Sequence, residues 1–300
     1  MSLSPDNGEF RIVPENPYTP EAPPPPPAVD PAPRRIPHIG HALLFIVTAL
    51  GILFGSQFLL MLLGKSPAAV RQGTITLQHP MLQMASLGAT YLLTLAISWV
   101  IFPRIWNRSF LEGIRWNGYT ARVHAPRLVA LGLVLGLLIQ VLTYFITPPK
   151  TLPIDEFFAT PADAWAMTFF GIIVAPTFEE ICFRGFLVPA FAVAYDFLSL
   201  RRTPEAELHW QTTTILTPVS LMFSAVATSL LFAWMHAQQL AHLWAALVAL
   251  FSVSLLLTIV RVRTQSVAAS TVVHAAYNSF IFIAVLIQTG GYRHLDRLAR

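Results

Sequence analysis

The sequence predicts an all-α fold, a polytopic transmembrane helical bundle with about seven or eight spans. The first observation behind this prediction is composition: 55% of the 300 residues are hydrophobic, 11% are charged, and the mean hydropathy is +0.60, values typical of an integral membrane protein. The second is that the apolar residues form continuous runs near the roughly 20 residues that a membrane-crossing helix needs. Because these runs do not alternate with polar residues, helices are favoured over the strands of a barrel.

Seven runs are predicted as spans: 41–63, 81–102, 128–146, 164 to about 187 or beyond, 219–235, 240–260 and 267–288. Residues 1–37 precede them and hold half of the 24 prolines, so we expect a disordered, proline-rich cytoplasmic arm. No signal peptide is recognisable, and the first run is expected to be an uncleaved anchor. Arg34 and Arg35 directly before it favour a cytoplasmic N-terminus.

The basic residues gather in the predicted loops. Five arginines lie between residues 104 and 127 together with Trp106 and Trp116, which is typical of a cytoplasmic segment at the membrane interface. This topology explains the net charge of +4, so no nucleic-acid partner is predicted. The compact length and the arm favour a bacterial inner membrane. The expected divisions are the arm (1–37), N-terminal helices with the basic loop (38–150), a second transmembrane unit (151–290) and a short polar tail (291–300).

The run 164–200 is longer than one span and contains Pro176 and Pro189. One long tilted helix gives seven spans and two shorter helices give eight. The distribution of basic residues fits both topologies almost equally well, so the positive-inside rule does not decide between them.

Two carboxylates and an arginine lie inside this apolar run: Glu179, Glu180 and Arg184. An ionisable side chain at mid-bilayer costs roughly 2.5–3.5 kcal/mol, so such a cluster indicates a functional site facing the bundle interior. Glu180 and Arg184 are four residues apart and are expected to pair on one helix face. Glu179 points about 100° away and is left unpaired, which suits a general base. A purely structural ion-pair network is the alternative.

Polar side chains recur in two later spans. Phe232 is followed four residues later by His236, and His274 by Asn278. Polar groups inside a membrane tend to converge on a shared interior site. Simple hairpin counting places His236 at a different depth from Glu179, so we expect a break near one of the two prolines, or tilted helices, to bring them together.

The residue types allow two hydrolytic arrangements. In the first, Glu179 and His236 hold and deprotonate a water, while His274 and Asn278 stabilise the oxyanion. In the second, Glu179, His236 and His274 form a zinc site. The single cysteine, Cys182, excludes an internal disulfide and is interpreted as a small apolar filler. No His-Glu-x-x-His motif occurs.

These motifs resemble those of the CPBP group of intramembrane proteases, which includes the CAAX prenyl endopeptidases and bacteriocin-processing or immunity proteins of the Abi-like type. The three motifs of the group, EExxxR, FxxxH and HxxxN, occur in the same order on successive predicted spans. They correspond here to Glu179, Glu180 and Arg184, to Phe232 and His236, and to His274 and Asn278. The resemblance covers roughly residues 164–288.

The resemblance implies an intramembrane endopeptidase acting on a membrane-associated peptide or protein, prenylated in the CAAX type. Residues 151–290 would be its catalytic domain, with Glu179 and His236 activating water, His274 and Asn278 stabilising the oxyanion, and Glu180 and Arg184 supporting them. It leaves open whether zinc or glutamate alone serves the chemistry. Two alternatives remain: a non-catalytic peptide-binding or immunity protein of the same fold, and a proton-coupled transporter that uses the Glu/Arg cluster.

Overall fold

A computed structural model describes residues 35–63, 80–144 and 153–299 of the chain. Nearly all of the predicted proline-rich arm (1–37) lies outside the described residues. The described part is helical and contains no strand, which confirms the predicted all-α bundle. Seven stretches are long and apolar enough to cross a membrane. They are α1 (Ile39–Leu63), α3 (Pro80–Trp106), α6 (Ala125–Tyr144), a rod spanning Pro161–Leu198, α11 (Pro218–Met235), α12 (Trp244–Thr264) and α13 (Val267–Gln288).

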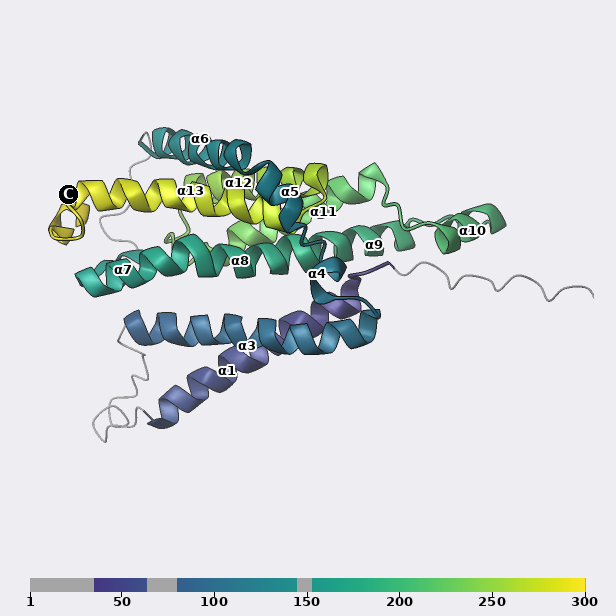
Figure 1. Ribbon diagram of the computed structural model, residues 1–300, viewed down its shortest axis with the longest axis horizontal. Coiled ribbons are helices and arrows are strands. Elements are labelled where there is room, and N and C mark those ends of the chain that lie inside the picture. The colour runs from purple at the N-terminus through teal and green to yellow at the C-terminus, as the bar shows by residue number, and fades with distance from the viewer. Residues whose placement is uncertain (1–34, 64–79, 145–152, 300) are drawn as a thin grey trace, which may run out of the picture.

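The rod is the central element of the bundle. Its parts follow one another without a gap: α7 (Pro161–Phe169), η2 (Phe170–Val174), α8 (Ala175–Glu180), η3 (Ile181–Leu187) and α9 (Val188–Leu198). The run 164–200 is therefore one helix and not two spans. At 38 residues the rod is roughly 57 Å long, well above the ~30 Å of a hydrocarbon core. Consistent with this length, α9 and the following α10 (Pro204–Thr212) project beyond the other helices in Figure 1.

The rod contains two π-helical turns, η2 and η3, and each is followed closely by a proline. The N–H of residue i in a π-helical turn bonds to the carbonyl of residue i−5, and proline has no N–H. Pro176 therefore leaves the carbonyl of Gly171 without a partner in the rod, and Pro189 does the same to the carbonyl of Arg184. Side chains of other spans replace the missing donors: Asn278 Nδ2 lies 2.6 Å from the Gly171 oxygen and Arg261 Nε 3.2 Å from the Arg184 oxygen. The rod thus continues through both prolines, so the first of the two expected alternatives, a break near a proline, is not found.

Helix α13 packs along α6 over most of its length. Gly132 and Gly136, one turn apart on α6, make this close approach feasible. A Cβ atom at Gly132 would lie 2.4 Å from the Val273 carbonyl oxygen, and one at Gly136 would lie 2.7 Å from Cβ of Phe280. Small residues spaced by four let helix backbones approach closely in membranes, so this pair fixes α13, which carries His274, against the bundle.

Aromatic side chains join α1 and α3 to the rod. Phe186 of η3 lies in an aromatic cluster with Phe45 of α1 and Phe102 and Trp106 of α3, at ring-centroid distances of 4.5–5.9 Å. Trp106 is only 2% exposed. The short helix α4 (Phe110–Gly113) folds over it with the ring of Phe110 parallel to its own, so Trp106 packs inside the protein.

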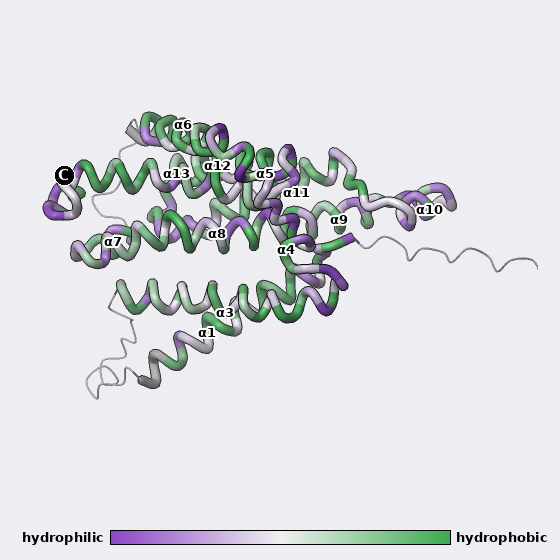
Figure 2. The backbone as a smooth tube through the Cα atoms, in the orientation of Figure 1, coloured by the Kyte–Doolittle hydropathy of each residue, from purple (hydrophilic) through white to green (hydrophobic). Residues whose placement is uncertain are grey.

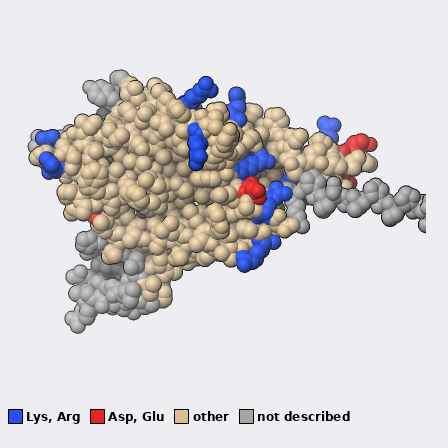
Figure 3. All heavy atoms as spheres, viewed as in Figure 1, with Lys and Arg blue, Asp and Glu red and all other residues tan. Residues whose placement is uncertain are grey.

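The two ends of the bundle differ in charge. Figure 2 shows apolar residues along the spans and hydrophilic ones at α4, α10 and the C-terminal segment. In Figure 3 the Lys and Arg side chains gather mainly around the end that carries α4 and α5 (Gly118–Val123). With seven spans, the first described residues and the C-terminus lie at opposite ends of the bundle (Figure 1). Five arginines from the predicted loop between residues 104 and 127 thus belong to one basic end.

Candidate active site

The predicted carboxylates lie at the junction between α8 and η3, near the middle of the rod. Glu179 and Glu180 are the last residues of α8, and Arg184 lies in the π-helical turn that follows. Helix α11 starts at the projecting end, packs along α9 and reaches η3. Its C-terminal end therefore arrives beside the carboxylates, because the long rod sets the starting point of α11 well away from them. His236 therefore lies at the same depth as Glu179, although a count of simple helical hairpins had placed the two residues at different depths.

Glu180 is the centre of a fully buried network. Its Oε1 accepts hydrogen bonds from Arg184 Nη1 at 2.9 Å and from His274 Nδ1 at 3.0 Å. Arg184 donates its other terminal nitrogen to the carbonyl and hydroxyl oxygens of Ser254, at 2.7 and 2.8 Å. Glu180 and Arg184 have no exposed surface, and the predicted i,i+4 pair is thus confirmed as a buried ion pair. The network joins the rod to α12 and α13.

Glu179 stays outside this ion pair, as its position on the helix predicted. Its side chain is 17% exposed, and its Oε2 lies 3.8 Å from His274 Nε2. His274 therefore stands between the two carboxylates. An ionised carboxylate only accepts hydrogen bonds, so His274 carries a proton on Nδ1 toward Glu180, and its Nε2 faces Glu179.

His236 follows the last residue of α11, and the helix end orients its ring. The backbone N–H of His236 bonds to the Ala233 carbonyl, which is a tightened last turn. The carbonyl of Phe232 instead lies 2.8 Å from Nδ1 of His236. Because a carbonyl only accepts, Nδ1 carries the proton and Nε2 of the neutral ring is left as an acceptor. Phe232 also stacks on His236 at 4.6 Å and lies 5.2 Å from the guanidinium of Arg184.

Glu179 and His236 line the same small cavity, of about 90 Å³. A water molecule needs roughly 10–15 Å³ of such space, so the cavity has room for water between the two side chains. The other lining residues are Tyr91, Phe178, Cys182, Phe183, Met235 and Gln239. Met235 is 66% exposed, so the cavity reaches the outer, apolar surface of the bundle.

Asn278 lies one turn after His274 on α13, but its amide nitrogen is engaged with the backbone. The Nδ2 group donates to the Gly171 carbonyl that Pro176 leaves free. An amide nitrogen carries two hydrogens, so one N–H remains for another acceptor. The motif residue thus has a structural contact that the sequence did not reveal.

The alternative zinc arrangement does not fit the described residues. Among them, no group of three or more His, Cys, Asp or Glu side chains is arranged to hold a metal ion. His274 offers Nδ1 to Glu180, and its Nε2 is 3.8 Å from the Glu179 oxygen. His236 shares the small cavity with Glu179, but His274 does not line that cavity. The set Glu179, His236 and His274 is therefore not brought together as metal ligands.

Sequence reasoning missed several residues of this region. Ser254 in α12 provides two acceptors for Arg184, and Tyr91 in α3 and Gln239 line the cavity. A polar side chain inside an apolar span is the one signal that points to Ser254 and Tyr91. Serine and tyrosine are too common in membrane helices for that signal to single them out.

Residues 161–280 match a family model described as type II CAAX prenyl endopeptidase Rce1-like. No curated protein and no solved structure matched the chain. The matched segment contains the rod and α11, α12 and most of α13, and with them every residue of the Glu180 network and of the three motifs. The part of the chain that carries the candidate site is therefore similar to the Rce1-like type II CAAX prenyl endopeptidases.

Proposed function

We propose that the protein is an intramembrane endopeptidase that hydrolyses a peptide bond of a membrane-associated or lipidated, CAAX-type substrate. The observation that carries this proposal is the shared cavity of Glu179 and His236 beside the buried network of Glu180, Arg184 and His274. Activation of a water needs a base, here Glu179, and an acceptor that orients the water, here His236. The buried network beside them holds the site rigid.

In the first step a water in the cavity donates one hydrogen bond to Nε2 of His236 and one to the carboxylate of Glu179. Glu179 takes the proton as the water oxygen attacks the scissile carbonyl carbon. The carbonyl oxygen becomes an oxyanion, which His274 and the second N–H of Asn278 stabilise. For His274 this role requires a proton on Nε2 in addition to the one on Nδ1 that faces Glu180.

In the second step the tetrahedral intermediate collapses. Glu179, now protonated, donates its proton to the leaving amine nitrogen, the C–N bond breaks, and a carboxylate and an amine are released. Glu180 and Arg184 take no part in proton transfer. They position His274 and hold η3, which follows Glu179 directly.

The position of the cavity supports a substrate that arrives from the membrane. Met235, an exposed residue of the cavity wall, connects the cavity with the apolar helix surface, and the buried rings of Phe178 and Phe183 make its inner wall apolar. Its volume suits waters and the scissile carbonyl. A lipid anchor of the substrate would lie outside it, against the apolar surface of the spans.

The proposal is tested by cleavage of a panel of membrane-tethered and prenylated peptides with the purified protein in detergent or vesicles. Glu179→Gln and His236→Ala should lower kcat by at least 10²-fold, the usual contribution of a general base. Glu205→Gln, on the exposed surface of α10, is the matched control and should cleave like the wild type. Thermal unfolding of all four proteins excludes misfolding as the cause.

Cleavage that survives in Glu179→Gln would contradict the assigned roles. If the wild type cleaves no peptide of the panel but binds them, the protein is a non-catalytic peptide-binding member of the fold.

A further inference from the structure

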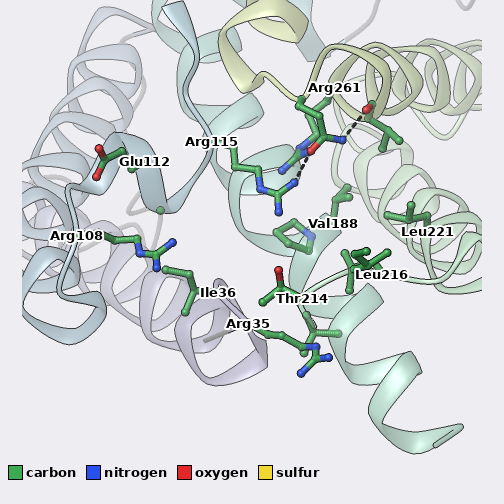
Figure 4. Close-up of a pocket in the computed structure, with 16 residues that line it drawn as sticks. Arg35, Ile36, Arg108, Glu112, Arg115, Val188, Thr214, Leu216, Leu221 and Arg261 are labelled. Carbon is green, nitrogen blue, oxygen red and sulfur yellow. Dashed lines mark hydrogen bonds between the residues drawn. The ribbon is translucent and has the colours of Figure 1, made fainter. Parts of the chain in front are cut away.

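A second and larger cavity, of about 490 Å³, lies at the basic end of the bundle. We call it the arginine cavity. Four segments that are distant in sequence contribute one arginine each, as Figure 4 shows: the chain before α1, the α3–α4 connection, the α4–α5 connection and the last turn of α12. These residues are Arg35, Arg108, Arg115 and Arg261. The catalytic residues proposed above do not line it.

The arginine cavity carries a net positive charge that acidic side chains do not balance. Its lining includes one carboxylate, Glu112, which accepts the backbone N–H of Ser109 in a capping box. None of the four arginines forms a salt bridge with an acidic residue in the described part of the chain. Asp196 acts on Arg35 through its charge, but its carboxylate accepts hydrogen bonds from Thr217 and Ser220 at 2.6–3.0 Å.

The guanidinium groups are held in place by neutral partners. Arg35 stacks on the ring of Trp210, 3.6 Å from its centroid, and burial lowers the pKa of Arg35 despite the charge of Asp196. Arg115 donates to the side chain of Gln265. Arg261, which is only 5% exposed, uses its Nε for the Arg184 carbonyl. Placing cations together without anions is costly, and Arg115 and Arg261 repel each other.

Two residues at the arginine cavity have a left-handed backbone conformation. Arg115 has φ 59° and Gln265 φ 50°, in the left-handed region that non-glycine residues avoid. Both side chains meet at the cavity (Figure 4). The left-handed conformation at Gln265 ends α12, as is common at helix C-termini. The left-handed conformation at Arg115 ends α4 in a similar way, because the N–H of Trp116 bonds to the Leu111 carbonyl and the N–H of Arg115 to the Glu112 carbonyl. The ends of α4 and α12 thus bring these two side chains to the cavity.

The remaining walls of the arginine cavity are mainly apolar. They are formed by side chains of α9, the α10–α11 connection and the start of α11, namely Val188, Pro189, Val193, Ile215, Leu216 and Leu221. Clustered arginines match phosphate oxygens in geometry and charge, and the apolar walls match the hydrocarbon part of an amphiphile. A soluble polyanion would use only the first of these two features.

We propose that the arginine cavity binds the phosphate group of an anionic membrane lipid, with the first carbons of its acyl chains against the apolar walls. Basic pockets between helices at the cytoplasmic side are a known form of headgroup recognition in other membrane proteins. The shared chemistry, a phosphate, is also offered by inorganic phosphate, and the experiment separates the two sources.

The test is native mass spectrometry of the detergent-solubilised protein titrated with phosphatidic acid, phosphatidylglycerol and phosphatidylcholine of identical acyl chains. In a separate arm, inorganic phosphate competes for the bound lipid. Wild type should bind both anionic lipids more tightly than phosphatidylcholine. Arg108→Gln with Arg115→Gln removes two exposed arginines of the cavity and should weaken anionic lipid binding at least tenfold.

Arg122→Gln with Arg127→Gln is the matched control. It removes the same charge from exposed positions at the same end, outside the cavity, and should change binding less than threefold. An equal loss in both pairs would mean general surface attraction and would overturn the proposal. The proposal would also be overturned if phosphatidylcholine bound as tightly as the anionic lipids. It would likewise be overturned if inorganic phosphate bound with the same affinity as the anionic lipids and displaced them. Lipid binding is measured here without turnover, so the result is independent of the proposed protease activity.

Discussion

At the scale of single residues, the most consequential feature is the burial of Glu180 and Arg184. A carboxylate and a guanidinium without exposed surface are tolerated because each has several partners: His274 and Arg184 for the carboxylate, Ser254 for the guanidinium. Breaking such a pair from one side leaves an uncompensated charge in a low-dielectric interior.

Glu180→Gln should therefore lower the free energy of unfolding by about 3–5 kcal/mol. Replacing both partners, as in Glu180→Gln with Arg184→Met, should recover part of this loss because no lone charge remains. Denaturant unfolding in detergent measures both. The exposed Glu207 on α10 supplies the control, for which Glu207→Gln should stay within about 0.5 kcal/mol of wild type. Equal stability of Glu180→Gln and wild type would show that the pair is not a support.

At the scale of elements, the rod owes its geometry to two π-helical turns and the prolines that follow them. Each proline removes one backbone donor, and each orphan carbonyl is satisfied by a side chain from another span. Asn278 and Arg261 therefore act as replacements for N–H groups. This gives a physical reason for an asparagine at that position on α13 besides its proposed catalytic role.

This pairing predicts a coupling between Pro176 and Asn278. Asn278→Ala should cost about 1–3 kcal/mol in the free energy of unfolding, because the buried Gly171 carbonyl loses its donor. In a Pro176→Ala background the new N–H can serve the same carbonyl, so the cost should be smaller. A double-mutant cycle measures the difference. Additive effects would mean that the proline and the asparagine act independently.

The close contact of α6 with α13 predicts that replacing a glycine by alanine has very different effects on stability at two positions. Gly132→Ala places a Cβ 2.4 Å from the Val273 carbonyl oxygen and should destabilise the protein by about 1–3 kcal/mol, because the helices must move apart. Gly51→Ala in α1 meets nothing within 4 Å and should be neutral or stabilising, since alanine favours a helix by up to about 1 kcal/mol. Thermal unfolding of the two variants compares them directly, and similar shifts would contradict the close packing.

At the scale of the whole molecule, the charge difference between the two ends predicts an orientation. The positive-inside rule assigns the end with α4, α5 and Arg35 to the cytoplasm. Cys182 is the one cysteine of the chain, so a Cys182→Ser background allows single cysteines to be introduced.

A cysteine at Tyr119, which is 78% exposed in α5, should resist a membrane-impermeant maleimide in intact cells and react in inverted vesicles. A cysteine at the exposed His294, near the C-terminus, should show the opposite pattern. Labelling of both positions from the same side would contradict seven spans, and a reversed pattern would contradict the orientation.

The sequence by itself determined the bundle and the limits of most spans, and it predicted the residues of the candidate site. Apolar runs of span length have one stable solution in a bilayer, and charged residues inside them are costly enough to mark function. The pairing of Glu180 with Arg184 also follows from local spacing alone.

Only the tertiary structure decided how the three motifs meet. One rod instead of two spans, the depth of His236 beside Glu179, the occupation of Asn278 by Gly171 and the burial of Trp106 all depend on contacts between distant segments. The same holds for the arginine cavity, whose four cations come from four separate places in the chain. Local patterns carry no information on such contacts, because helix packing and the carbonyls freed by proline are satisfied by whichever neighbour the fold supplies.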